Sequence, residues 1–219
     1  MKKALITGIT GQDGFYLSKF LLDKGYEVFG LYRRTVLDVS QRVPDIDPRV
    51  KLVEGDLTDS LSLMSIIKRC DPDEIYNLAA QSFLLTSWEE PGLVSDVNGM
   101  AVLKILEAIK LINPRIKFYQ ASSREIFGVP KESPQTEETA INPLNPYAAA
   151  KAFGQAIIES YKEKYGIYAS SGIQFNHESP RRGMDFVTKV ISSSVAKIKL
   201  GKQEFLEIIN EETDRLNKF

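Results

Sequence analysis

The chain has 219 residues, of which 43% are apolar and 26% are charged, a composition that suits a packed globular core and excludes a disordered chain. The 28 basic and 29 acidic side chains give a net charge of -1, which argues against a nucleic-acid or anionic-membrane partner. A single cysteine, Cys70, excludes an internal disulfide and a multi-thiolate metal site. The sequence shows neither a signal peptide nor an apolar run of the ~20 residues that span a membrane. We therefore predict a protein of the reducing cytoplasm that holds no metal.

Short apolar runs alternate with stretches of helical periodicity along the chain. Strands are predicted at 4–6, 27–32, 50–53, 74–79, 116–120 and 168–175. Helices are predicted at 15–22, 61–67, 94–112, 147–165, 186–200 and 204–216. A proline-rich surface loop is expected at 128–146. Such alternation predicts an α/β fold in which helices cover both faces of a parallel sheet.

The first predicted strand leads into a turn with three glycines, and a helix follows it. In this setting Gly8 permits a tight turn, Gly11 lets a diphosphate approach the backbone, and Gly14 lets the helix pack closely. The turn therefore predicts a Rossmann-like doubly wound parallel sheet that binds a dinucleotide. The cofactor-binding residues predicted here are Gly8, Ile9, Thr10, Gly11, Gln12, Asp13 and Gly14.

The end of the second strand indicates which dinucleotide is bound. An acidic residue at this point would bind the ribose hydroxyls of NAD, whereas an arginine accommodates the 2'-phosphate of NADP. The sequence has Arg33 and Arg34 here and no carboxylate before Asp38, so NADP is the predicted cofactor. Asp56 and Leu57, which follow the third strand, are expected to bracket the adenine.

A tyrosine and a lysine begin a later helix four residues apart, and they therefore share one face of it. Tyr147 is a poor base at the ordinary pKa of a phenol, but the ammonium of Lys151 would favour the phenolate. Such a pair takes a proton from an alcohol while a hydride passes to a nicotinamide. Ser123, at the end of a strand, is placed to hold the substrate oxygen.

The glycine turn, the strand-end serine and the Tyr-x-x-x-Lys pair together resemble the extended short-chain dehydrogenase/reductases. Four strings, at 8–14, 77–82, 118–125 and 175–183, more narrowly resemble the GDP-mannose 4,6-dehydratase family. The resemblance runs in order from residue 1 to about residue 202.

This resemblance implies a reaction in which a hexose is oxidised, dehydrated and reduced again. Tyr147 would deprotonate the 4-hydroxyl of GDP-mannose as NADP accepts a hydride, and Glu125 would take the C5 proton and help water leave from C6. Return of the hydride to C6 would give GDP-4-keto-6-deoxymannose. The implied catalytic residues are Ser123, Glu125, Tyr147 and Lys151. Further cofactor residues are Leu78, Ala79, Ala80, Gln81, Ser82, Lys151, His177 and Arg182, and the implied substrate residues are Ser82, Ser123 and Asn176.

The sequence also departs from the family pattern. Arg124 stands where the family has a small residue, Leu93 stands where a tyrosine is expected, and 35–40 lack the basic run through which family subunits reach a neighbour's cofactor, so homo-oligomerisation stays open. We predict an NADP-binding domain at 1–175, with a remnant of the substrate region and a charged terminal helix at 176–219, the substrate domain being largely absent. The alternatives are a non-catalytic NADP-binding protein or a related nucleotide-sugar reductase or epimerase.

Overall fold

The computed structural model describes residues 1–33, 45–83 and 86–206. The chain divides into two compact units, Met1–His177 and Glu178–Phe219. The predicted domain boundary after residue 175 lies close to this division.

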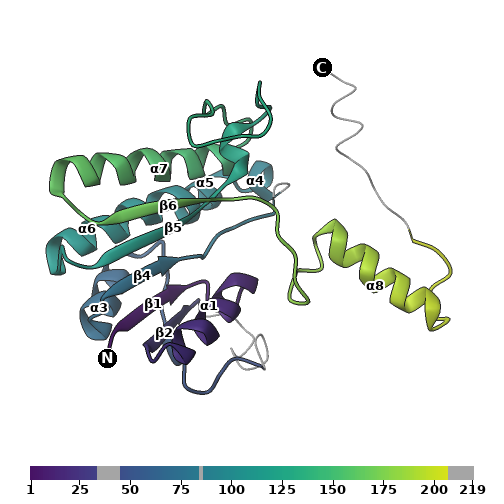
Figure 1. Cartoon of the computed structure of the whole chain (residues 1–219), viewed down its shortest axis with the longest axis horizontal. Helices are drawn as coiled ribbons and strands as arrows, with labels where there is room; N and C mark the ends of the chain where they lie inside the picture. The colour runs from purple at the N-terminus through teal and green to yellow at the C-terminus, as the bar shows by residue number, and fades with distance from the viewer. Residues whose placement is uncertain (34–44, 84–85, 207–219) are drawn as a thin grey trace. The chain divides into compact units, whose positions relative to one another are not determined.

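The first unit contains a six-stranded sheet in the order β3-β2-β1-β4-β5-β6, and every neighbouring pair of strands is parallel (Figure 1). The strands are β1 (Lys3–Thr7), β2 (Glu27–Tyr32), β3 (Lys51–Glu54), β4 (Glu74–Asn77), β5 (Lys117–Ser123) and β6 (Ala169–Gln174). The strand order reverses between β1 and β4, where doubly wound sheets bind ligands beyond the carboxyl ends of the strands. The predicted Rossmann-like doubly wound fold is confirmed.

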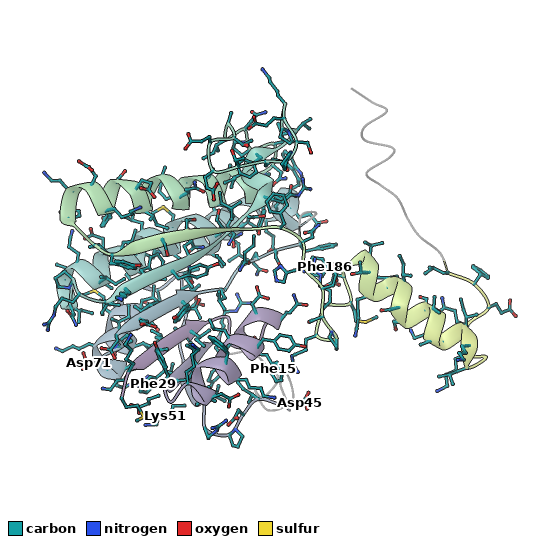
Figure 2. The ribbon with its side chains drawn as sticks, in the orientation of Figure 1. Phe15, Phe29, Asp45, Lys51, Asp71 and Phe186 are labelled. Atoms are coloured by element: carbon teal, nitrogen blue, oxygen red, sulfur yellow. The ribbon has the colours of Figure 1, made fainter. Side chains whose placement is uncertain are left out.

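Helices cover both faces of the sheet. The helices of the first unit are α1 (Gln12–Asp23), α3 (Ser60–Cys70), α4 (Thr86–Glu89), α5 (Pro91–Ser95), a π-helix η1 (Asp96–Met100), α6 (Ala101–Ile112), a 3-10 helix η2 (Arg124–Phe127) and α7 (Pro146–Tyr165). Apolar residues of α3, α6 and α7 pack on one face around the buried Phe118, and α1 packs on the other face against Ile6. At the sheet edge the ammonium of Lys51 on β3 lies 5.5 Å from the ring centre of Phe29 on β2 (Figure 2).

Side chains at the helix ends explain where helices begin and end. Asp59 caps α3 by accepting hydrogen bonds from the N–H groups of Leu61 and Ser62. Asn145 caps α7 in the same way, Pro146 occupies its first turn, and Gly166 ends it with a positive φ of 64°. The helix predicted at 94–112 is interrupted at its start by the π-helical turn η1.

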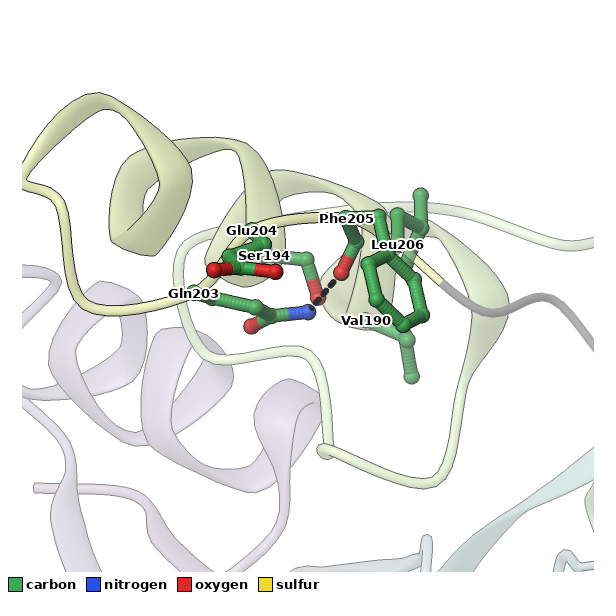
Figure 3. Close-up of a pocket in the computed structure, with 6 residues that line it drawn as sticks. All are labelled: Val190, Ser194, Gln203, Glu204, Phe205 and Leu206. Atoms are coloured by element: carbon green, nitrogen blue, oxygen red, sulfur yellow. Dashed lines mark hydrogen bonds between the residues drawn. The ribbon is translucent and has the colours of Figure 1, made fainter.

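The second unit contains α8 (Val187–Lys199) and the segment that follows it. Residues 204–206 are not helical, so the helix predicted from 204 is wrong at its start; its remainder lies outside the described residues. Val190 and Ser194 of α8, with Gln203, Glu204, Phe205 and Leu206, line a pocket of about 320 Å³ (Figure 3). Within the described ranges no helix is both long and apolar enough to cross a membrane.

Candidate active site

The glycine turn brings three backbone segments into contact. Gly8 has a φ of 70°, and its carbonyl accepts a 2.9 Å hydrogen bond from Gly11 N. A Cβ on Gly8 would lie 2.7 Å from Ala79 N, and a Cβ on Gly14 would lie 2.4 Å from Gly8 O. Side chains are therefore excluded at both positions. Gly14 thus lets helix α1 pack closely, and its nearest neighbours are backbone atoms of the turn.

The segment after β6 is fastened to the first turn of α1. His177 Nε2 lies 2.8 Å from Asp13 Oδ1, and its Nδ1 lies 2.9 Å from the carbonyl oxygen of Phe175. Gln12 Nε2 donates a 3.3 Å hydrogen bond to the carbonyl of His177. Three residues predicted to bind the cofactor thus lie together at the start of α1, and Asn176 stands exposed beside them.

Arg33 follows β2 and is exposed, whereas Arg34 lies outside the described residues. Asp56, after β3, accepts 2.8 Å hydrogen bonds from the backbone N–H and the hydroxyl of Thr58. Burial acts to raise the pKa of the Asp56 carboxyl, but these hydrogen bonds and the charge of Arg33 outweigh it, so that the pKa is lowered overall. Leu57, next to it, is buried. The structure therefore brings Arg33 and Asp56 together beyond the carboxyl ends of β2 and β3.

The four predicted catalytic residues gather where β5 ends and α7 begins. Ser123 ends β5 and is the N-cap of η2. Its side-chain hydroxyl accepts a 3.2 Å hydrogen bond from the N–H of Glu125. The Tyr147 phenol lies close enough to the Ser123 side chain for that hydroxyl to act on its pKa. One helical turn later, Lys151 places Nζ 5.7 Å from the centre of the Tyr147 ring and donates a 2.8 Å hydrogen bond to Ala121 O.

Burial controls the protonation of this pair. It raises the pKa of the Tyr147 phenol; the Ser123 hydroxyl acts to lower that pKa, and the charge of Glu125 raises it. It also lowers the pKa of Lys151 to about 8. The expectation that the lysine lowers the pKa of the phenol is therefore wrong for this structure, because desolvation of the phenol is the main effect.

Arg124 contacts the carboxylate that the sequence singles out as acid and base. One of its guanidinium nitrogens, Nη2, lies 2.7 Å from Glu125 Oε1. Their side chains are 41% and 21% exposed, so water reaches the pair and weakens their attraction. Arg124, which stands where the family has a small residue, thus forms a direct ion pair with Glu125.

Comparison with known proteins adds the family to this geometry. A family model described as GDP-mannose 4,6 dehydratase matches residues 5–216. The chain belongs to the GDP-mannose 4,6-dehydratase family. The match extends over both units of the chain.

Individual relatives of this family are similar along nearly the whole chain. The GDP-mannose 4,6-dehydratase of Yersinia enterocolitica is 46% identical, covering 98% of this chain and 60% of its own length. A Vibrio cholerae relative is 50% identical over 95% of this chain and 59% of its own length. The Homo sapiens relative is 48% identical over 97% of this chain and 60% of its own length. The chain therefore spans about 60% of the length of these relatives.

Solved structures share the fold. The UDP-glucose 4-epimerase of Thermus thermophilus, in complex with NAD, has a TM-score of 0.79 at 26% identity and covers 91% of this chain and 63% of its own. The dTDP-glucose 4,6-dehydratase of Bacillus anthracis, also in complex with NAD, has a TM-score of 0.76 at 24% identity, covering 90% and 62%. The dehydratase family thus uses a scaffold found in other nucleotide-sugar enzymes.

Sequence reasoning missed how the loop after β4 is held. Asn98, on the π-helix, accepts a 3.0 Å hydrogen bond from Gln81 N and donates a 3.0 Å hydrogen bond to Gln81 O. Asn98 is 1% exposed, and its position four residues after the buried Val94 on an amphipathic helix was the available signal. This amide fixes the loop that carries Leu78, Ala79, Ala80, Gln81 and Ser82.

Arg182 belongs to the second unit and makes its described contacts there. Its Nε lies 3.5 Å from Glu178 Oε2, and its guanidinium lies 3.7 Å from the centre of the Phe186 ring. The pocket of Figure 3 lies in the same unit. Among the described residues, those that line it do not include any predicted site residue. A smaller pocket of about 230 Å³ in the first unit includes Asp13 and Leu78, both predicted to bind the cofactor.

Proposed function

We propose that the chain catalyses the dehydration of GDP-mannose to GDP-4-keto-6-deoxymannose. The observation that carries the proposal is the placement of Glu125 beside Ser123 and Tyr147, with Lys151 one helical turn further along α7. A hydroxyl oxidation needs the serine, tyrosine and lysine alone. The additional carboxylate supplies the proton transfers that an elimination requires.

NADP is the proposed cofactor, and the residues present fit a dinucleotide. Gly8 and Gly14 let α1 begin directly at the turn, and Gly11, its N-cap, has no side chain with which to cap it. A glycine turn that leads into a helix N-terminus is the kind of site at which a diphosphate binds. The exposed guanidinium of Arg33 supports a 2'-phosphate at the end of β2. Asp56 and Leu57 would lie at the adenine.

In the proposed mechanism NADP, held at the glycine turn and by Arg33, would supply the hydride chemistry for oxidation at the hexose C4 and reduction at C6. Ser123 donates a hydrogen bond to the 4-oxygen, and Tyr147 takes the proton of that hydroxyl. Lys151 keeps its ammonium 5.7 Å from the centre of the Tyr147 ring while this proton is transferred. Glu125 then removes the C5 proton, which the 4-ketone has made acidic, and returns a proton to the hydroxyl that leaves from C6 as water. When a hydride has been added at C6, C5 is protonated again, and the proton that Tyr147 took from the 4-hydroxyl balances this step.

The remaining assignments are part of the same proposal. Residues 1–175 bind NADP, with Leu78, Ala79, Ala80 and Gln81 lining the cofactor and His177 fixing the start of α1. Ser82 and Asn176 bind the substrate, and 176–219, including Arg182, contribute to its binding region. The single buried thiol, Cys70, supports a cytoplasmic location.

The test is an assay of the purified chain with NADP+ and GDP-mannose for a 4-keto product, with deuterium incorporation at C5 measured in heavy water. Glu125→Gln should oxidise C4 but lose C5 exchange and turnover by about 10²- to 10⁴-fold, because the amide keeps the shape of the side chain and cannot take a proton. Tyr147→Phe should block the first oxidation as well. Undiminished C5 exchange in Glu125→Gln would remove Glu125 from the mechanism.

A non-catalytic NADP-binding protein is the second candidate, and the Arg124–Glu125 ion pair favours it because the guanidinium engages the proposed base. Under this alternative the wild-type chain binds NADP+ and forms no 4-keto product. Arg124→Ser separates the two cases, since it restores a small residue and releases Glu125. Product formed by this variant alone would identify the ion pair as the reason for inactivity.

A further inference from the structure

A row of buried polar side chains crosses three neighbouring strands of the sheet. Thr7 on β1, Asn77 on β4 and Gln120 on β5 are 1%, 1% and 2% exposed. Thr7 Oγ1 donates to Asn77 Oδ1 at 2.6 Å, and Asn77 Nδ2 donates to Gln120 Oε1 at 2.6 Å. Buried strands of parallel sheets are usually apolar, and a buried amide is costly unless it is hydrogen-bonded. These side chains therefore form a satisfied network in a place where apolar residues would ordinarily pack.

The row begins at the cofactor turn. Thr7 Oγ1 accepts a 3.1 Å hydrogen bond from Ala79 N. That same nitrogen is the atom nearest to a Cβ built on Gly8. The first member of the row thus touches the loop that packs against the proposed dinucleotide site.

The row ends at the carbonyl that holds the lysine of the proposed active site. Gln120 Nε2 donates a 2.8 Å hydrogen bond to Ala121 O, and Lys151 Nζ donates a second 2.8 Å hydrogen bond to the same oxygen. Pairing between β4 and β5 ends at the Asn77–Gln120 pair, so Ala121 lies one residue beyond it. The side-chain amide of Gln120 therefore contacts this carbonyl where strand pairing with β4 has stopped.

The orientation of the Gln120 amide is set by its neighbour. Because Asn77 presents an N–H to Oε1, the NH₂ group of Gln120 must face Ala121 O. Reversal of the amide would place two donors opposite each other at one end and two oxygens opposite each other at the other end. Asn77 thus locks Gln120 in the orientation that donates to the carbonyl.

We propose that Gln120 is a positioning residue for the reaction: locked by Asn77, it fixes the Ala121 carbonyl that holds the ammonium of Lys151 beside Tyr147. The effect of Gln120 on turnover rests on the proposed function. Its effect on the protonation of Lys151 does not. Thr7 and Asn77 connect this support to the loop at the cofactor turn. Among the described residues, Tyr147 on the same helix is the titratable group beside Lys151, and Glu125 on η2 acts on that phenol.

Loss of the Gln120 amide should change the protonation of Lys151. Ala121 stays paired with Gly172 on β6, but its carbonyl loses the side-chain contact that orients it. The buried ammonium is then held by a less well oriented acceptor, while its burial is unchanged. The charged form is then less stabilised, and the pKa of Lys151 falls further below its present value of about 8. A net hydrogen-bond contribution of the usual size corresponds to a fall of about half to one pH unit.

The test is the titration of Lys151 in the whole chain by NMR of ¹³C-labelled lysine side chains, with the signal assigned from Lys151→Met. Gln120→Met removes the amide at similar length, and Gln120→Asn keeps an amide too short to reach both partners. Both should lower the midpoint. The matched control is Gln174→Met on β6, where the amide contacts Tyr119 at 3.5 Å, and it should leave the midpoint unchanged.

An unchanged or raised midpoint in whichever Gln120 variant folds would overturn the proposal, as would an equal shift in the Gln174→Met control. Failure of both Gln120 variants to fold would also overturn it, because the row would then serve the fold itself. The titration needs neither cofactor nor substrate. A chain that does not turn over GDP-mannose therefore still returns a result, and the two proposals fail separately.

Discussion

Lys151 carries a charge into the interior of the first unit. It is 4% exposed, and burial lowers the pKa of its amine to about 8 from an ordinary value of 10.5. Between these two values the unfolded chain binds a proton that the folded chain has released. Stability therefore rises as the pH increases from about 8 to 10.5, and below pH 8 the full cost of burying the charge is present.

We predict that Lys151→Met stabilises the protein at about pH 7 by roughly 1 to 3 kcal/mol, because an apolar side chain of similar shape removes this cost. The difference from the wild type should shrink as the pH approaches about 10. Urea unfolding at about pH 7 and about pH 9.5 measures both effects. A variant that is less stable than the wild type at pH 7 would show that the hydrogen bond to Ala121 outweighs desolvation.

The residues of the candidate site differ in how far the sequence alone reveals them. Gly8, Gly11 and Gly14 form a local pattern within one strand–turn–helix unit, and Tyr147 and Lys151 lie one helical turn apart, so spacing alone brings them together. Asn98 and Gln120 act through partners 17 and 43 residues away in the chain. No local spacing reveals such contacts, because they depend on which strands and helices become neighbours.

At the scale of elements, a strand can be predicted from the sequence where turn-forming or charged residues flank its apolar run on both sides. The strand at 27–32 has the predicted bounds, since Gly25 and the arginines after Tyr32 delimit it. The π-helical turn in the helix predicted at 94–112 was not anticipated, because apolar periodicity continues through it. Single π turns inside helices are frequent at functional sites, and here the turn carries Asn98 to the loop after β4.

We predict that Asn98→Ala loosens that loop. The change removes both hydrogen bonds to the backbone of Gln81 and leaves its N–H and carbonyl groups without their partner, at a cost of about 1 to 3 kcal/mol. Amide hydrogen exchange at Gln81 should accelerate, and NADP affinity should fall. Exchange at Gln81 equal to that of the wild type would show that other contacts hold the loop.

Two glycines in helices provide a matched pair of substitutions. We predict that Gly14→Ala destabilises the protein by about 1 to 3 kcal/mol, because its Cβ would lie 2.4 Å from Gly8 O, a backbone atom that cannot move aside cheaply. Gly92→Ala, in α5, meets no described atom within 4 Å and should gain about 0.5 to 1 kcal/mol from helix propensity. Denaturant unfolding compares them, and equal effects would contradict the close approach of α1 to the turn.

At the scale of the whole molecule, the described first unit contains both proposed sites on one sheet. The glycine turn follows β1, Arg33 follows β2, and the catalytic cluster lies at the end of β5 and the start of α7. Parallel strands bring these ends to one edge, so residues more than a hundred positions apart in sequence lie where we propose that one cofactor binds. Cofactor binding should therefore stabilise this unit as a whole.

We predict that NADP+ at about 100 times its dissociation constant raises the free energy of unfolding of the first unit by about 2.7 kcal/mol, since it binds only the folded state. NAD+ at the same concentration should stabilise less, and Arg33→Asp should reverse the order by removing the guanidinium that pairs with the 2'-phosphate and supplying a carboxylate for ribose hydroxyls. Unfolding monitored with each cofactor, for wild type and variant, measures the preference. Equal stabilisation by the two cofactors in both proteins would contradict the role of Arg33, while stabilisation by NADP+ without any 4-keto product from GDP-mannose would favour the non-catalytic alternative.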